Sequence, residues 1–230
     1  MVCLCFAMKK EASPLLEECE ILEKRKSGYA ELFLCKKGSS NFLILVSGIG
    51  KGFACSGLTS ALLLYKIDSV INAGVAGSLD EEKAPLLSCV VSSSLVQHDM
   101  DTSAIGDPKG MLSGINLVEL PADSRLGQDL LEAAGRAGFS CGFGRISSGD
   151  TFFLPNDPKK HEAVETFHPL VIDMESACFA QIAYVFGIPY CSLRVISDCK
   201  HPETEYAENV AEASRRVKRV LEEYLKGRRS

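Results

Sequence analysis

The 230-residue sequence has no apolar run that approaches the length of a membrane span, which excludes a membrane-embedded protein. It also has no concentrated basic segment, because 25 Lys and Arg stand against 30 Asp and Glu that are spread along the chain. Nucleic-acid binding is therefore not expected. The opening "MVCLCFAM" has no basic start and runs directly into Lys9 and Lys10. It predicts a first buried strand rather than a signal peptide.

None of the ten cysteines belongs to a CxxC pair, and the four histidines lack the spacing of metal ligands. These are the usual signals of a bound metal ion, so no metal is expected. Cys3, Cys5 and Cys191 lie inside apolar runs, where a thiol packs as a small hydrophobic group. Domains held together by disulfides are usually much shorter and secreted. We therefore expect reduced thiols and a cytoplasmic protein.

The composition is typical of a soluble globular protein, with 46% hydrophobic and 24% charged residues. Short apolar runs alternate with segments of helical period. Residues 2–7, for example, predict a strand, and "SGIGKG" predicts the start of a long helix. Pro14 is expected in the first turn of its helix, where no backbone N–H is needed. The alternation predicts one α/β domain over residues 1–230, with three αβα layers around a central mixed, twisted β-sheet.

Carboxylates follow several of the predicted strands. Glu11 follows the first strand, Glu175 follows a later one, and Asp198 ends the strand that carries Arg194 and Ser197. Taken singly, each acid is more typical of a helix start or a turn. In open α/β sheets, however, ligands bind beyond the carboxyl ends of the strands. Three acids at one such edge, with an arginine, predict a functional crevice.

Two further segments allow more than one interpretation. "SGIGKG" could cradle a phosphate, but its spacing differs from that of the P-loop, and its glycines equally suit a tight turn between strand and helix. Phe152 and Phe153 follow a Gly-Asp turn, where an exposed ring could stack on a nucleobase. Paired phenylalanines are more often part of a hydrophobic core.

The motifs together resemble those of 5′-methylthioadenosine/S-adenosylhomocysteine nucleosidases. In order, they are "AMKKEASPLL", "VSGIGKGFA", "INAGVAGSLD", "SSLVQHDMD", "GRISSGDTFF", "VIDMESACFAQIAYVFGIPY" and "LRVISD". The match runs from about Val2 to Tyr206, and Glu11 points to the nucleosidase branch of the nucleoside phosphorylase superfamily. The resemblance implies a nucleoside phosphorylase-like fold, an adenine nucleoside substrate, a homodimer, a role in methionine salvage, and no cofactor.

The resemblance also implies the catalytic roles. Asp198 would be the general acid that protonates N7 of adenine, oriented by Ser197, so that the base leaves as a neutral molecule. Such an acid must keep its proton near neutral pH, and burial favours this by raising its pKa. Glu11 would position and deprotonate the attacking water, assisted by Arg194. Glu175 would hold the ribose hydroxyls, and the nearby carboxylates would stabilise a positively charged sugar.

The remaining implied residues surround the substrate. Phe152 would stack on adenine, and the main chain of Phe153 would hold it. Met8, Ile49 and Tyr206 would line an apolar slot for the 5′-thioether. The complete set implied to bind substrate is Met8, Ile49, Val75, Ala76, Gly77, Ile105, Phe152, Phe153, Met174, Arg194, Ser197 and Tyr206.

The sequence departs from the family pattern in three places. Phe6 stands where the family usually has glycine, and Val75 stands where many members have a serine near the catalytic water. The lost hydroxyl removes one hydrogen bond, which is worth about 0.5–1.5 kcal/mol. Residues 199–206, which would form the lip over the 5′-substituent, are fewer than usual. Ile105 of the neighbouring subunit would reach the slot for the 5′-thioether.

Three other functions compete with this one. A nucleoside phosphorylase would need arginines for phosphate, but "AMKKEASPLL" and "NAGVAGS" contain none, and Glu11 would repel the anion. A nucleosidase for a futalosine-type nucleoside fits the same motifs. A nucleoside-binding protein without catalysis would have no need for an acid near N7 and another beside a water.

Overall fold

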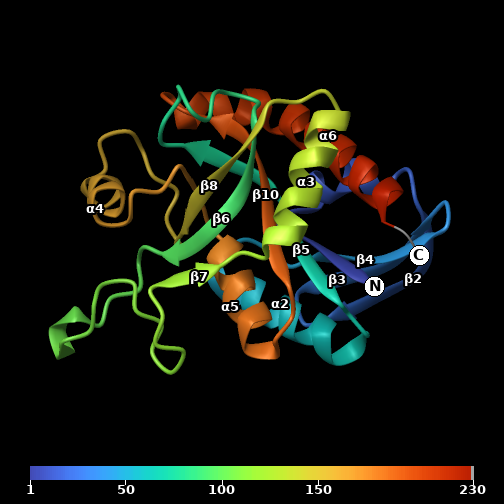
Figure 1. The fold of residues 1–230 in the computed structure, drawn as a ribbon, viewed down its shortest axis with the longest axis horizontal. Helices are drawn as coiled ribbons and strands as arrows, with labels where there is room; N and C mark the ends of the chain where they lie inside the picture. The colour runs from blue at the N-terminus through green and yellow to red at the C-terminus, as the bar shows by residue number, and fades with distance from the viewer. Residues whose placement is uncertain (229–230) are drawn as a thin grey trace.

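The computed structural model describes residues 1–228, in which ten strands form one mixed sheet between two groups of helices (Figure 1). The strands are β1 (Val2–Phe6), β2 (Glu20–Ser27), β3 (Ala30–Lys37), β4 (Ser40–Val46), β5 (Ser69–Ser78), β6 (Cys89–Gln97), β7 (Glu119–Pro121), β8 (Cys141–Ser148), β9 (Val171–Asp173) and β10 (Tyr190–Asp198). The helices are α1 (Lys9–Leu16), α2 (Lys51–Leu64), the short 3₁₀ helix η1 (Ser103–Ile105), α3 (Ser124–Arg136), α4 (Pro158–Phe167), α5 (Ser176–Phe186) and α6 (Pro202–Gly227). The predicted fold class, α/β with a nucleoside phosphorylase-like mixed sheet, is confirmed.

Five strands of the sheet close into a ring. β10 pairs with both β6 and β5, and the ring continues from β6 through β8 and β9 back to β5. The other strands, β1, β4, β3 and β2, extend from β5 as an open arm. β5 therefore belongs to both parts of the sheet and lies at their junction.

One edge of β5 changes its partner strand near the middle. Its pairing with β1, which is parallel, ends at Asn72 opposite Cys5. Its pairing with β9, which is antiparallel, begins at Gly77 opposite Ile172. β1 and β9 thus approach the same edge from opposite ends. The backbone of β5 between these pairings is open to side chains, and a cavity forms there.

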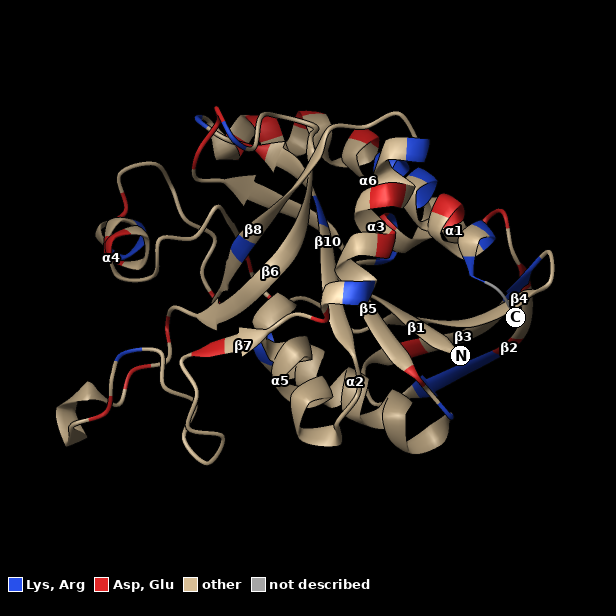
Figure 2. Cartoon of the chain, viewed as in Figure 1, with Lys and Arg blue, Asp and Glu red and all other residues tan. Residues whose placement is uncertain are grey.

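Helices cover both faces of the sheet, as predicted. Helices α1, α3 and α6 pack on one face, and α2 and α5 pack on the other, so each face has its own hydrophobic core. The apolar side of α6 is buried through Val217, Val220 and Leu221, which recur at helical spacing. Charged residues of both signs lie along α3 and α6 (Figure 2). Among the described helices, none has both the length and the apolar character needed to span a membrane.

Some local predictions were wrong. Pro14 is the sixth residue of α1 and not part of its first turn, because the helix begins at Lys9. β2 was missed because its sequence, "EILEKRKS", is mostly charged and its side chains are largely exposed. Backbone pairing with β3 holds it in place as an edge strand, and charged side chains are common on such edges. The short β7 was missed as well.

Candidate active site

A cavity of about 280 Å³ lies where β1, the middle of β5, β9 and β10 meet. Every residue predicted for the site lines this cavity except Ile105, Phe153 and Arg194. Its wall also includes Ala7, Ile172 and Asp173, which the sequence analysis did not select. The strands that contribute to the cavity do not all run in the same direction. Glu175 follows β9, which is antiparallel to β5, and β5 contributes its middle rather than its end.

Asp198 reaches the cavity through an irregularity in β10. The pairing between β10 and β5 shifts between Ile196 and Asp198, so that Ser197 is the extra residue of a bulge. Such a bulge re-aims the next side chain. The Ser197 hydroxyl donates a 2.6 Å hydrogen bond to Oδ1 of Asp198. Burial raises the pKa of the Asp198 carboxyl above its ordinary value.

Gly77 makes room for this acid. A Cβ atom at position 77 would lie 2.8 Å from Oδ2 of Asp198, which is closer than a carbon and an oxygen normally approach. A side chain at this position would therefore displace the Asp198 carboxyl from the cavity wall.

Glu11 is held by two backbone N–H groups. Met8 donates to its Oε2 at 2.9 Å, and Val75 donates to its Oε1 at 3.1 Å. The Met8 contact also caps the start of α1. Burial raises the pKa of Glu11, although the positive charge of Arg194 and both backbone donors oppose the shift. The carboxyl is therefore fixed on the cavity wall with little exposure to solvent.

Glu175 is held by the segment that precedes α2. The backbone N–H of Gly50 donates a 2.7 Å hydrogen bond to Oε1 of Glu175. Gly50 has a φ of 92°, a conformation that favours glycine. The glycines of "SGIGKG" thus form a turn that binds a carboxylate of the protein itself. Burial, followed by the neighbouring charge of Asp173, raises the pKa of Glu175 to about 8.

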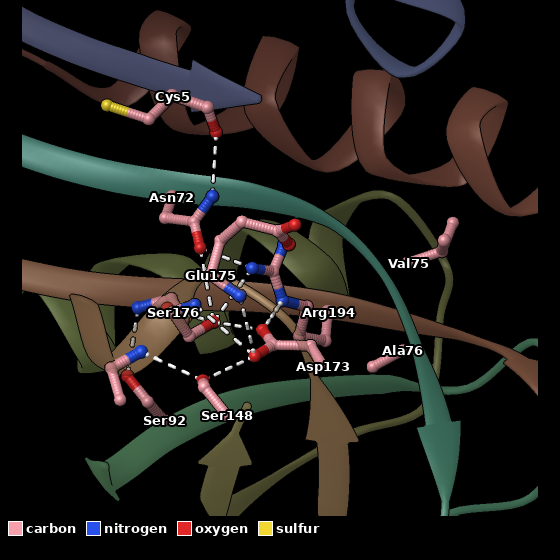
Figure 3. A network of polar contacts seen from close by, with 12 residues as sticks. Cys5, Asn72, Val75, Ala76, Ser92, Ser148, Asp173, Glu175, Ser176 and Arg194 are labelled. Atoms are coloured by element: carbon pink, nitrogen blue, oxygen red, sulfur yellow. Dashed lines mark hydrogen bonds and ion pairs between the residues drawn. The ribbon is translucent and has the colours of Figure 1, made fainter. Parts of the chain in front are cut away.

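Arg194 lies behind the cavity wall, in a buried polar network (Figure 3). Its Nε forms a 2.7 Å ion pair with Asp173, and the side chains of both residues are only 3% exposed. Nη2 of Arg194 donates hydrogen bonds to Asn72 and to the hydroxyl of Ser176. Asp173 also accepts from the hydroxyls of Ser148 and Ser176. The signal that could have identified Asp173 is its place at the start of "DMES".

Gly74 lets Arg194 and Glu11 approach each other. A Cβ atom at position 74 would lie 2.6 Å from Oε1 of Glu11 and 2.7 Å from Nη1 of Arg194. Both groups therefore occupy the space beside the bare backbone of β5. The guanidinium acts on Glu11 through its positive charge, which lowers the pKa of that carboxyl against the effect of burial.

The mouth of the cavity is formed by aromatic and thioether side chains. Phe152 is 50% exposed, and its ring meets that of Tyr206 edge-on at 5.9 Å between centroids. Tyr206 lies in the second turn of α6, and its hydroxyl is 3.5 Å from Sδ of Met8. The segment predicted to form a lip thus continues directly into α6. The opening is apolar, whereas the acids lie deeper.

Ile105 and Phe153 do not line the cavity of their own chain, and the resemblance implies only the main chain of Phe153 and the Ile105 of a neighbouring subunit. Phe153 is 7% exposed and packs against the ring of His98, with the ring centroids 5.3 Å apart. Ile105, in η1, is 81% exposed and belongs to the green segment that projects from the body of the molecule in Figure 1.

Two positions differ in residue type from the family pattern. Phe6 is a buried core residue, and Val75 lines the cavity.

The arrangement suits general acid–base chemistry. Three carboxyl groups with raised pKa values face one small cavity, so that one can donate a proton while another accepts one. Across residues 1–228 there is no cluster of three or more His, Cys, Asp or Glu side chains that could hold a metal ion. The acid–base chemistry can be built from these carboxyl groups alone.

Comparison with known proteins gives concordant results. The phosphorylase superfamily model matches residues 2–226. A 5′-methylthioadenosine/S-adenosylhomocysteine nucleosidase of Geobacillus thermodenitrificans is 34% identical, with 86% of this chain and 84% of that protein covered. The nucleosidase of Glaesserella parasuis is 31% identical, with 86% and 85% covered.

Among solved structures, a futalosine hydrolase of Helicobacter pylori superimposes with a TM-score of 0.91 at 26% identity, covering 98% of this chain and 97% of that one. A Helicobacter pylori 5′-methylthioadenosine/S-adenosylhomocysteine nucleosidase with butyl-thio-DADMe-Immucillin-A gives the same TM-score, identity and coverage.

Proposed function

Because the chain belongs to the phosphorylase superfamily and, within it, to the 5′-methylthioadenosine/S-adenosylhomocysteine nucleosidases, we propose that it hydrolyses one or both of these nucleosides to adenine and the thioribose product. It is an N-glycosyl hydrolase. The observation that carries the assignment of roles is the convergence of Glu11, Glu175 and Asp198 on one cavity.

Asp198 is the general acid in this proposal. Its raised pKa favours the protonated form at a pH where an ordinary aspartate is ionised. The proton moves from Asp198 to N7 of adenine as the bond between C1′ and N9 breaks, and the bonding electrons stay with the base. Adenine then leaves as a neutral molecule. The Ser197 hydrogen bond orients the carboxyl for this transfer.

Glu11 accepts the proton of the attacking water. The oxygen of that water bonds to C1′, and one of its protons passes to the Glu11 carboxylate. The two backbone donors, Met8 and Val75, aim the carboxylate and favour its ionised form. Arg194 supports the same form from behind the wall through its charge. In this interpretation, Arg194 positions Glu11 and does not touch the substrate.

Glu175 binds the ribose. Its carboxyl lines the cavity beside Met174, and a carboxyl group can accept hydrogen bonds from sugar hydroxyls. The partial negative charge of its carboxyl oxygens also stabilises the oxocarbenium character of the sugar in the transition state.

The lining of the cavity favours water over phosphate as the nucleophile. No lysine or arginine lines it within the described part of the chain, whereas Glu11, which is proposed to act as a carboxylate on the water, does line it. A phosphate ion would be repelled there, but a water molecule would not. A futalosine-type nucleoside is a second candidate substrate, supported by the likeness to the Helicobacter pylori futalosine hydrolase.

A homodimer and a cytoplasmic location complete the proposal. Ile105 is exposed and does not line the cavity of its own chain, which fits a residue that reaches the 5′-slot of a second copy. All ten cysteines are free, which fits a reducing compartment.

The test is product analysis with and without phosphate. The purified protein is incubated with 5′-methylthioadenosine, S-adenosylhomocysteine and futalosine, and the released base and sugar are identified. Release of adenine from either thionucleoside in phosphate-free buffer is expected. Release that requires phosphate would assign a phosphorylase, and binding without release would assign a nucleoside-binding protein.

A further inference from the structure

A second cavity, of about 590 Å³, adjoins the one that holds the three acids. The two cavities share Ala7, Met8 and Ile49 as walls. Met8 and Ile49 belong to the proposed 5′-slot, so the second cavity begins where the 5′-substituent of a bound nucleoside would point. A role for this cavity in substrate binding rests on the proposed function and extends it to the substituent.

The second cavity is positively charged. Lys9 and Lys26 line it, against the single carboxylate of Glu31. Glu31 forms ion pairs with two lysines, at 3.0 Å with Lys24 and at 4.0 Å with Lys9. Lys26 lies opposite Glu31 in the β2–β3 pairing and forms no ion pair with any residue of the described chain. Lys26 is therefore a cation without a fixed partner at the edge of a cavity.

One wall of the second cavity is aromatic. The rings of Tyr29 and Phe53 lie 4.6 Å apart between centroids. They pack over Gly48, where a Cβ atom would lie 2.9 Å from the Tyr29 ring. The φ of Gly48 is 101°, so the close approach of the rings and the backbone conformation both require glycine. An alkyl chain could pass along this wall, with its charged end at the lysine.

We propose that the second cavity binds a carboxylate at the end of the 5′-substituent, with Lys26 as its cationic partner. A methylthio group is neutral and offers no charged group to Lys26. The homocysteine group of S-adenosylhomocysteine is longer and ends in a carboxylate and an ammonium, and the carboxylate is the group that Lys26 can bind. Lys26 is thus a specificity determinant that favours carboxylate-bearing thionucleosides over 5′-methylthioadenosine.

The test compares three 5′-thioadenosines on the wild-type enzyme and on Lys26→Met. The substrates carry a methyl, an uncharged butyl and a 3-carboxypropyl group on sulfur, and S-adenosylhomocysteine is a fourth. For Lys26→Met, kcat/KM for the two carboxylate substrates should fall about threefold to tenfold, as expected for one charge-assisted contact near the surface. The values for the methyl and butyl compounds should stay within about twofold.

Two control variants complete the design. Lys26→Arg keeps the charge and should retain most of the preference for the carboxylates. Lys36→Met removes an exposed lysine at the other end of the same hairpin, opposite Glu20, and should alter no substrate ratio. Equal losses for all four substrates, or no change in the ratio for Lys26→Met, would overturn the inference. If the wild-type enzyme cleaved no thionucleoside at all, the proposed function would fail instead.

Discussion

The backbone N–H of Val75 donates a 3.1 Å hydrogen bond to the carboxylate of Glu11. This contact exists because the pairing of β5 with β1 has ended before Val75 and that with β9 has not yet begun. It depends on the backbone of position 75 and not on its side chain. The valine that stands in place of the family's serine therefore leaves the support of Glu11 intact, and removes only a hydroxyl from the cavity wall.

Val75→Ser should increase activity. The new hydroxyl adds one hydrogen bond to the water or to the sugar, so kcat/KM for 5′-methylthioadenosine should rise about twofold to tenfold. Adenine release at several substrate concentrations measures the change, and thermal unfolding shows whether the variant is intact. An intact variant with an unchanged or lower rate would show that the valine is not a deficit.

Asp198→Asn should abolish turnover while the fold remains intact. An amide cannot deliver the proton to N7, and loss of a general acid costs on the order of a hundredfold to ten-thousandfold in rate. Ser197→Ala, which removes the orienting hydrogen bond but not the acid, should cost much less. Adenine release and circular dichroism of both variants provide the check. A near-normal rate for Asp198→Asn would remove the acid role from this residue.

Glu175 should make stability depend on pH. Its pKa is raised from 4.5 to about 8 in the folded protein, so folding favours its protonated form. Its contribution is fully present below pH 4.5 and is lost as the pH rises through about 8. Glu175→Gln stays neutral and can still accept from Gly50. Relative to wild type, this variant should gain melting temperature as the pH rises from 4.5 to about 8; a constant difference would contradict the raised pKa.

Asp173→Asn should destabilise the protein strongly. The change leaves the buried guanidinium of Arg194 without its ionic partner, which costs about 3–5 kcal/mol in the free energy of unfolding. Denaturant unfolding measures this difference. Asp80→Asn is the control, because it removes an ion pair to Lys83 at the surface and should leave the midpoint nearly unchanged. Similar midpoints for both variants would mean that the buried pair stabilises little.

Gly74→Ala should impair catalysis. The added Cβ would press on Glu11 and Arg194 together, and a displacement of about 1 Å in a catalytic group can cost on the order of a hundredfold in rate. Gly52→Ala is the matched control, since no atom lies within 4 Å of the Cβ that it would add. Steady-state kinetics of the two variants are compared, and equal activity would show that the Glu11 site can adapt.

Much of the architecture could be predicted from local pattern. The strand predicted over residues 2–7 is β1, and the long helix predicted to start at "SGIGKG" is α2. The exceptions have a common cause. β2 has no apolar pattern of its own and exists through its pairing with β3. Pairing of this kind depends on contacts between separate segments, which local periodicity does not report.

The residue types at the strand ends are a property of the sequence alone. Glu11, Glu175 and Asp198 follow apolar strands, and that order is sufficient to indicate acid–base chemistry at one place in an α/β protein. The direction in which each side chain points, and the groups that it contacts, are not determined by the sequence pattern alone. Only the closed ring of strands brings β9 against β5 in the opposite sense, turns Arg194 inward to Asp173, and leaves Ile105 outside. Side-chain chemistry is local, whereas the environment that sets a pKa or a contact is assembled from segments that meet only in the folded chain.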